Sequence, residues 1–493
     1  MARIGFRLNR IFGKSTIVTD ILGVGYSAGV TITPMFVIIG NVMLMGKVLG
    51  FDKVGYASRE LFSCTLLYIF IFALLTASPF NSVLSRYMSD VIYKEQFDDI
   101  LPCYYVGAFL NIMCTALLGI PFCVHEFFAG HVNILYVFTG YCGYVSLVFV
   151  FYSMLYLSIC KDYARIALFF LIGMVAAFVL SLVFAWVLHM SVPSSMLLGL
   201  VLGFFVIACC ELATVRYYFK KNSGHYREVL IYFKKFYTLV VTNFCYTLGL
   251  YIHNFIFWNT DLKMITANSF ICAPSYDMAT CIAMFTNISA TVILIARMEM
   301  NFHDKYKAFS EAVIGGRGAD IRNCQNRMFH QLAVELMNLV RIQFIITVIV
   351  FLLCEVFLPQ LGFAGMVMRI YPCLAVGYFI LFLMYSEIIF LFYFNDNVGA
   401  MMTAMVFLLS TAVASYFSAN LAERWFGLGV VAGSYIGWTF GYMRLRWVER
   451  HMDVHVFCQG TLIPSQNGEP ESPKSYDAYA GLKSSNGGVA QNE

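Results

Sequence analysis

The sequence predicts an all-α polytopic membrane protein with twelve transmembrane helices in two six-helix lobes. Three observations carry this prediction. The chain of 493 residues is 60% hydrophobic and only 12% charged, and its mean hydropathy of +0.74 excludes an ordinary soluble domain. Apolar stretches of about 20 residues, the length that crosses a hydrocarbon core, follow one another from Ile21 to Met443. The connections between them are too short to hold a soluble catalytic domain, which favours transport.

Each predicted span is an apolar run set off by a short connection. The ninth, for example, begins directly after the polar residue Arg341. The twelve spans are 21–49, 61–84, 100–124, 134–160, 164–190, 195–219, 236–258, 277–298, 342–361, 370–394, 398–420 and 426–443.

The distribution of lysine and arginine predicts that both termini are cytoplasmic. Twelve spans place the termini on one side, and that side carries 23 lysines and arginines against 6 on the other, leaving out the distal tail and Arg341. Positive charge in short loops gathers on the cytoplasmic side of a membrane. Only the first outside loop, with Lys47, Lys53 and Arg59, runs against this pattern. The expected location is the inner (plasma) membrane.

Composition divides the chain into five segments. Six spans precede a basic stretch and six follow it, which suggests duplicated halves, a plan common among transporters. The chain before the first span is basic and amphipathic, and its far end has little to bury. The predicted segments are a cytoplasmic amphipathic N-terminal segment 1–20, a first lobe 21–219, a basic cytoplasmic linker 220–235, a second lobe 236–450 with a cytoplasmic amphipathic connection 301–331, and a disordered cytoplasmic tail 451–493.

The sequence contains no motif for catalysis or nucleotide binding. The fifteen cysteines form no CxxC pair, and most of them lie in spans, where cysteine behaves as a small apolar residue. His451 and His455 precede Cys458, but no further metal ligand follows, so we interpret this group as a chance cluster. There is no P-loop or dinucleotide fingerprint. The sequence therefore predicts no enzyme, no cofactor and no metal site.

The seventh span carries a polar and aromatic stripe. At about 100° per residue, its members fall within one stripe about 80° wide. A polar stripe must face protein or water, because lipid would leave its amides unsatisfied. A substrate path and hydrogen bonding between helices are equal alternatives; mixed polar and aromatic groups suit a sugar. The candidate path residues are Asn243, Thr247, Tyr251, Asn254 and Trp258.

The first span has a second candidate face. Ser27, Thr31, Pro34 and Asn41 lie on one side of the predicted helix. Pro34 has no N–H and deprives a carbonyl of its helical partner, so a kink is expected there. The freed carbonyl needs a neighbouring helix or a water-filled cavity, and both remain open.

Charged residues supply three further candidates. Arg86, Asp90 and Tyr93 share a face at the inner end of the second span, which allows an Arg–Asp contact that acts either as a gate or as an interfacial anchor. Glu387 is the deepest acid in the predicted spans. It is a candidate proton or cation site or sugar acceptor, with a packing role as the alternative. Glu211 and Glu355 lie nearer span ends and rank lower.

Five stretches stand out along the chain: the opening MARIGFRL, the RYMSDVIY of 86–93, the GLYIHNFIFW of 249–258, the YDM of 276–278, and the run from Glu299 through Phe302 and Tyr306 to 315–317. In this order on a chain of twelve predicted spans, they resemble the PelG family of Pel exopolysaccharide transporters. The resemblance covers roughly residues 1–450. This chain has Ile32-Thr33-Pro34-Met35 where the family has Gly-Pro-Trp, and Glu299-Met300 where it has an acid and Thr.

The resemblance implies a member of the multidrug/oligosaccharidyl-lipid/polysaccharide flippase superfamily. It would pass an N-acetylgalactosamine-rich polysaccharide from a cytoplasmic glycosyltransferase to the outer face, for a biofilm matrix. The implied partners are a PelF-like glycosyltransferase and PelD-like and PelE-like membrane proteins. Arg297 and Glu299 join the gate or anchoring candidates.

The basic linker provides the candidate docking site for such a partner. Its residues are Lys220, Lys221, Lys234 and Lys235. The alternatives to polysaccharide transport are an ion-coupled exporter or flippase of lipid-linked oligosaccharide or small molecules on the same fold, and, more weakly, a scaffold that only assembles a synthase.

Overall fold

The computed structural model describes residues 34, 36–160, 162–267, 269–288, 302–315, 317–361 and 365–452, and these residues are almost entirely helical. A first helix covers Phe36–Leu49. The elements after it are α3 (Tyr56–Tyr93), α4 (Ile100–Phe128), α5 (Ile134–Ile159), α6 (Tyr163–Trp186), α7 (Val192–Tyr218), α8 (Tyr226–Lys235), α9 (Tyr237–Phe257), β1 (Met264–Thr266), β2 (Phe270–Cys272), α10 (Pro274–Asn287), α12 (His303–Gly315), α13 (Gly318–Phe357), α14 (Met366–Tyr393), α15 (Asn397–Ser418) and α16 (Leu428–Arg450), with short 3-10 turns η1 (Phe51–Lys53), η2 (Phe97–Asp99), η4 (Pro359–Leu361) and η5 (Glu423–Trp425).

The helices confirm the predicted fold class. Within the described residues, nine are long and apolar enough to cross a membrane. The other predicted spans fall on the first helix and α10, both of which adjoin residues outside the described ranges, and on α16, which is long enough but more polar. Twelve spans are therefore consistent with the structure. Helices suit this setting because they satisfy every backbone polar group internally.

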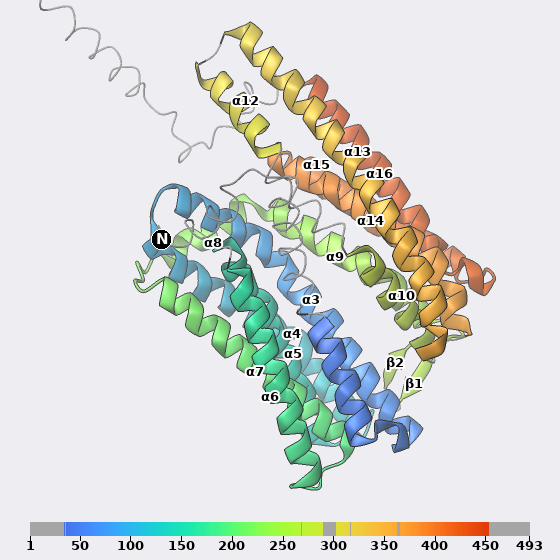
Figure 1. The fold of residues 1–493 in the computed structure, drawn as a ribbon. Helices are drawn as coiled ribbons and strands as arrows, with labels where there is room; N and C mark the ends of the chain where they lie inside the picture. The colour runs from blue at the N-terminus through green and yellow to red at the C-terminus, as the bar shows by residue number, and fades with distance from the viewer. Residues whose placement is uncertain are drawn as a thin grey trace, which may run out of the picture.

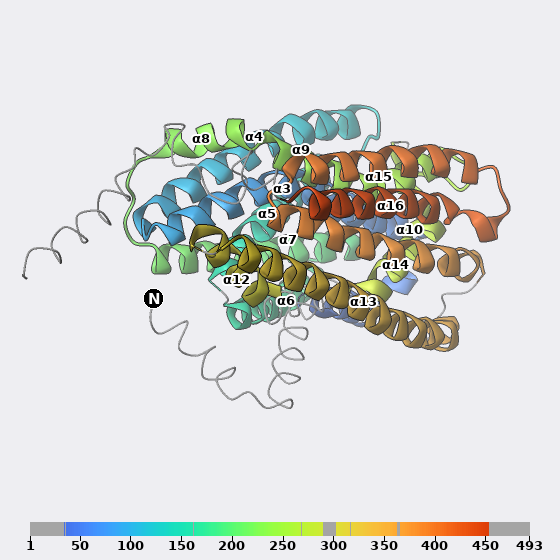
Figure 2. The same cartoon turned by 90° about the horizontal axis from the view of Figure 1, so that it is seen from above.

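Buried apolar side chains form two clusters. The first gathers residues from the first helix through α8, and the second gathers α9, α10 and α12 to α16. Figure 1 shows the two groups of helices side by side, with α3 of the first against α9 of the second. In the view from above, α13 lies at the edge of the second group beside α14 (Figure 2). The segment boundaries given above stay a prediction.

Two helices extend well beyond the predicted spans. Helix α3 runs to Tyr93, so Arg86 and Asp90 lie on a continuous helix that passes the expected end at residue 84. Helix α13 has 40 residues and joins the ninth span to the second part of the 301–331 connection. Hydropathy marks only the stretch that lipid covers, and a helix continues past it wherever nothing breaks its hydrogen bonding.

A short hairpin connects α9 to α10. Strands β1 and β2 pair antiparallel, with Met264 opposite Cys272 and Thr266 opposite Phe270. By chain order the hairpin belongs to the second half, yet Phe270 and Cys272 are buried in the cluster of the first. We call this end of the molecule the hairpin end, and the opposite end, where α8 lies, the linker end (Figure 1).

Candidate substrate path and lobe contacts

The polar stripe on α9 begins in a contact with α3. Asn243 donates its side-chain amide to the carbonyl oxygen of Ser78 at 3.1 Å and to the hydroxyl of Ser82. Both partners lie in the first half, so this end of the stripe joins the two halves. Asn243 therefore forms the interhelical hydrogen bonds that were the alternative to a path.

The other end of the stripe converges on Asp277 in the first turn of α10. Asn254 donates to Oδ1 of Asp277 at 2.7 Å, and the indole nitrogen of Trp258 lies 3.0 Å from both carboxylate oxygens. The backbone nitrogen of Ala273 donates to the same carboxylate at 3.0 Å. All four residues are buried. Asn254 and Trp258 thus fasten α9 to α10, and sequence reasoning gave Asp277 no role.

The middle of the stripe lacks such partners. Thr247 and Tyr251 are 6% and 8% exposed, and neither side chain hydrogen-bonds another residue within the described ranges. Neither hydroxyl is among the fully enclosed oxygen atoms that lack a partner, so each touches accessible space. Of the five stripe residues, these two are the ones whose side-chain hydroxyls no described residue engages.

A polar cavity lies next to the end of α9. It has a volume of about 700 Å³ and lies between α9, α14, α15 and η5 at the hairpin end. This size is in the range of small-molecule sites. Its polar lining residues are Asn259, Thr260, Asp261, Tyr416, Asn420 and Glu423.

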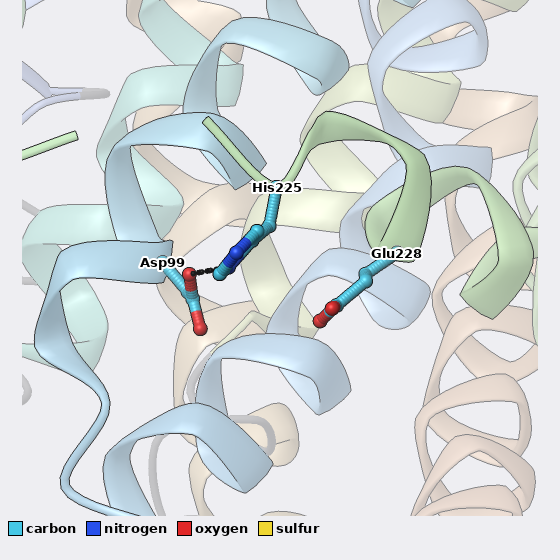
Figure 3. A group of neighbouring side chains, drawn as sticks. All are labelled: Asp99, His225 and Glu228. Carbon is cyan, nitrogen blue, oxygen red and sulfur yellow. Dashed lines mark hydrogen bonds and ion pairs between the residues drawn. The ribbon is translucent and has the colours of Figure 1, made fainter. Parts of the chain in front are cut away.

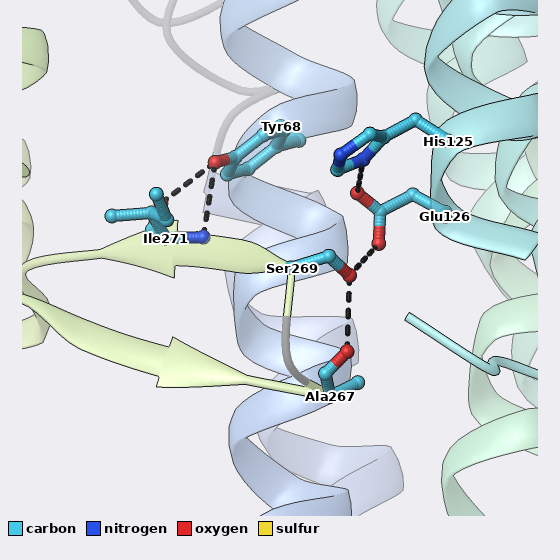
Figure 4. A network of polar contacts seen from close by, with 6 residues as sticks. All are labelled: Tyr68, His125, Glu126, Ala267, Ser269 and Ile271. Atoms are coloured by element: carbon cyan, nitrogen blue, oxygen red, sulfur yellow. Dashed lines mark hydrogen bonds and ion pairs between the residues drawn. The ribbon is translucent and has the colours of Figure 1, made fainter. Parts of the chain in front are cut away.

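The hairpin straps the second half onto the first (Figure 4). Tyr68 of α3 donates its hydroxyl to the carbonyl oxygen of Ile271 at 2.7 Å and accepts from the same residue's nitrogen at 3.3 Å. Ser269 donates to the carboxylate of Glu126 at the end of α4. The ring of Tyr68 also stacks on Trp258, with centroids 5.1 Å apart. These contacts close the hairpin end between the halves.

At the linker end, Arg86 crosses between the halves. Its guanidinium donates to the side-chain oxygen of Asn395, which follows α14, at 2.8 Å, and lies 4.2 Å from the ring centre of Phe236. Asp90 instead accepts the hydroxyl of Tyr232 on α8. Burial, and then this hydrogen bond, raise the pKa of Tyr232, so the hydroxyl keeps its proton. The shared helix face allowed a contact between Arg86 and Asp90. In the structure each of these residues instead bonds to a separate partner.

The two halves repeat the same helix packing. Helices α5 and α6 pack on α7 as α14 and α15 pack on α16. The contacts are close because glycines allow the backbones to approach. Each contact residue of α6 matches a residue of α15 at one constant difference in residue number. Each contact residue of α7 matches a residue of α16 at another constant difference. The matched contacts are Gly199 with Ser181 and Gly429 with Ser415, Gly203 with Ala177 and Gly433 with Thr411, and Gly173 with Ile207 and Gly437 with Phe407.

Each half buries a carboxyl group at the matching site. One turn beyond these contacts, α16 has Gly441, which lies against Glu387 of α14, and α7 has Glu211 at the corresponding position. Glu387 is 1% exposed and hydrogen-bonds Trp438, but its Oε2 has no partner. Glu211 is fully buried, and neither of its oxygens has a partner among the described residues. The glycine spacing of the two halves is the sequence signal that would have paired these acids.

Several predicted residues fall elsewhere or outside the described part. Pro34 lies at the start of the described chain and is half-buried, and Asn41 reaches the sulfur of Met174 on α6 at 3.6 Å. The residues outside the described part are Ser27, Thr31, Arg297, Glu299, His455 and Cys458, together with the side chain of Tyr93.

The four candidate docking lysines lie on and beside α8. All are exposed, two of them in the connection before α8 and two in its last turn. Tyr232 and the fully buried Val229 hold the opposite face of α8 on the first half. The lysines are Lys220, Lys221, Lys234 and Lys235.

The fold is similar to that of transporters of the MATE family. A multidrug resistance MATE family transporter of the MOP superfamily in its outward-facing conformation aligns with a TM-score of 0.55 and 13% identity, over 87% of this chain and 96% of that one. Its inward-facing conformation gives 0.55 and 13% over 87% and 95%. A MATE structure in the bent conformation gives 0.53 and 12% over 88% and 97%.

Sequence comparison identifies the family. No curated protein matches the chain in a sequence search. The model of the PelG family, described as "Putative exopolysaccharide Exporter (EPS-E)", matches residues 1–457 and so covers every predicted span. The chain therefore belongs to the PelG family and is a multi-pass membrane transporter rather than an enzyme.

Proposed function

We propose that the protein passes a Pel-type, N-acetylgalactosamine-rich exopolysaccharide across the plasma membrane for a biofilm matrix. The observation that carries this proposal is the family match over residues 1–457, joined to a MATE-type fold. A PelF-like glycosyltransferase supplies the polymer at the cytoplasmic face, and PelD-like and PelE-like proteins complete the membrane assembly. Both termini face the cytoplasm in this proposal, as the lysine and arginine distribution favours.

The sugar path runs along the middle of the α9 stripe. Thr247 and Tyr251 present hydroxyl groups that no described residue engages, and Tyr251 adds an aromatic ring. A sugar stacks one face on an aromatic ring and hydrogen-bonds through its hydroxyls, so this pair offers both contacts. The polar cavity beside the end of α9 is lined by other residues, and in this proposal it is a further candidate for the outer part of the path.

Replacing Tyr251 with Ala tests this path. We expect less exported polymer at an unchanged protein level, because lost stacking costs on the order of 1 kcal/mol at each contacted sugar, and a moving polymer meets that cost repeatedly. The measurements are exported polymer per folded molecule and the thermal unfolding midpoint of the purified protein.

Asn243→Ala is the matched control from the same stripe. Its amide is bonded to α3, so this change should lower the unfolding midpoint and leave export per folded molecule intact. If Tyr251→Ala lowered the unfolding midpoint but left export per folded molecule unchanged, the stripe would have a role only in helix packing. The proposed path would then be wrong.

A second candidate function is ion-coupled export of lipid-linked oligosaccharide or small molecules. The observation that favours it is the buried carboxyl group in each half, Glu211 and Glu387, with unpartnered oxygen atoms at matching sites. Intramembrane carboxyl groups often carry protons or cations in transporters. Under this alternative at least one of these acids is essential to export.

A further inference from the structure

Three metal-binding side chains meet where the first half contacts the linker helix α8 (Figure 3). Asp99 ends η2, His225 directly precedes α8, and Glu228 lies in its first turn. One donor atom from each lies within 4.8 Å of the others. Asp99 is buried, whereas His225 and Glu228 are exposed, so an ion can enter from solution. Asp99 and His225 are 126 positions apart, which is why the sequence gave no sign of the group.

Two of these side chains stand at helix starts without capping them. Asp99 precedes α4 and His225 precedes α8, yet neither side chain makes a cap hydrogen bond. Aspartate at this position normally accepts from the first backbone N–H groups of its helix. Here the carboxylate turns to His225, whose Nδ1 lies 3.0 Å from Oδ1 of Asp99. Two donors at right angles around an ion, with bonds of about 2.1 Å, are separated by roughly this distance.

A fourth group points independently to a ligand. Tyr87 of α3 is only 4% exposed, and its hydroxyl has no hydrogen-bond partner among the described residues. Its ring packs against that of Tyr232 on α8, with centroids 5.2 Å apart, so Tyr87 lies where α3 meets the linker helix. Buried polar atoms are nearly always paired, so an unpaired one at the contact between α3 and the linker helix calls for an occupant.

We propose that Asp99, His225 and Glu228 bind a divalent first-row transition cation such as Mn²⁺. The hydroxyl of Tyr87 contributes directly or through a coordinated water. Carboxylate and phenol oxygens suit Mn²⁺, and imidazole binds most first-row transition ions. The group contains no thiol, which would favour a softer metal. Two carboxylates offset the charge of the ion and the positive ends of the two helices. Glu228 is exposed and free to rotate the short distance that closes the set.

The bound ion would fix the linker to the first half. Asp99 belongs to the junction of α3 and α4, whereas His225 and Glu228 belong to the segment that connects the halves. The backbone nitrogen of Ser223 already donates to the carbonyl oxygen of Asp98 at 3.1 Å. A metal would add coordinate bonds to this contact and to those that His225, Val229 and Tyr232 already make, and would hold α8 in one orientation.

Titration of the purified full-length protein with Mn²⁺ tests the site. Free Mn²⁺ gives a six-line electron paramagnetic resonance signal that disappears on binding. We expect one equivalent to bind per chain, and His225→Gln and Glu228→Gln each to weaken binding at least about tenfold. Both residues are exposed, so these variants should fold. Tyr87→Phe should give a smaller loss.

Asp98→Asn is the matched control, because it removes a neighbouring carboxylate outside the group. It should bind Mn²⁺ as the wild type does. Mn²⁺ should also raise the unfolding midpoint of the wild type and of Asp98→Asn, but not of Glu228→Gln. An unchanged affinity in His225→Gln and Glu228→Gln, an equal loss in Asp98→Asn, or no stoichiometric binding by the wild type would each overturn the proposal.

Discussion

At the scale of single residues, the stretches that resemble the PelG family bond to one another. His253, Asn254 and Trp258 from GLYIHNFIFW contact Tyr276 and Asp277 from the neighbouring stretch. The first of these contacts joins the His253 ring to the Tyr276 hydroxyl at 2.9 Å. The polar residues of these stretches therefore first of all hold α9 on α10. Among the stripe residues of α9, Thr247 and Tyr251 are the ones that this packing does not engage.

The paired acids give a prediction at the same scale. Glu211→Gln and Glu387→Gln should fold with unfolding midpoints close to that of the wild type, because glutamine has nearly the same shape and no described residue forms an ion pair with either carboxyl group. The unfolding midpoints and the export per folded molecule are the measurements. If polymer synthesis drives movement, export stays within about twofold, less than 0.5 kcal/mol in rate terms.

A large loss of export at a normal midpoint would favour ion coupling instead. Glu387→Gln is the sharper of the two tests, because the side chain of Glu387 lies directly against Gly441 and glutamine keeps its shape. A midpoint well below that of the wild type would contradict the packing argument and indicate that the carboxylate has a cationic partner.

At the scale of elements, hydropathy locates helices well and their partners poorly. Lipid thickness dictates the length of an apolar run, so within the described residues the predicted spans fall on helices. The hairpin escaped prediction because each strand has only three residues. Periodicity showed that Asn243 and Asn254 share a face, but it cannot show which neighbour that face meets. Glu211 ranked low because its position near a span end is visible in the sequence, whereas its match to the Glu387 site requires the folded repeat.

One prediction concerns whether the hairpin must move during export. The thiol of Cys272 in β2 is hydrogen-bonded to that of Cys64 in α3, so the docked hairpin places two cysteines from different halves together. Mild oxidation should join them in a disulfide, which mass spectrometry would detect. If the hairpin must leave α3 for export, cross-linked protein should lose export and recover it on reduction.

Cys272→Ser is the control for this experiment. It should fold, because serine is close in size, and its export should be insensitive to the same oxidant. If cross-linking forms fully in the wild type and export continues at its former rate, the hairpin is a permanent strap rather than a moving one.

At the scale of the whole molecule, contacts between the halves occur at both ends. Tyr68 and Glu126 hold the hairpin at one end, and Arg86 holds Asn395 at the other. A transporter that works by alternating access opens one end while the other stays closed, and under that mechanism these contacts would not all persist through a transport cycle. Asp90 and Tyr232 meanwhile keep α8 on the first half, and we call the four exposed lysines on and beside this helix the lysine patch.

This lysine patch carries the last prediction, which concerns partner docking. Reversing Lys220, Lys221, Lys234 and Lys235 to Glu should weaken co-purification with the cytoplasmic glycosyltransferase and make the remaining association sensitive to salt, because exposed charges are screened beyond about 8 Å at physiological ionic strength. Lys53→Glu with Lys263→Glu is the matched control, since both lysines are exposed at the hairpin end. The control should co-purify as the wild type does. If the charge-reversed variant co-purified with as much glycosyltransferase as the wild type does, these lysines would have a role only in membrane topology.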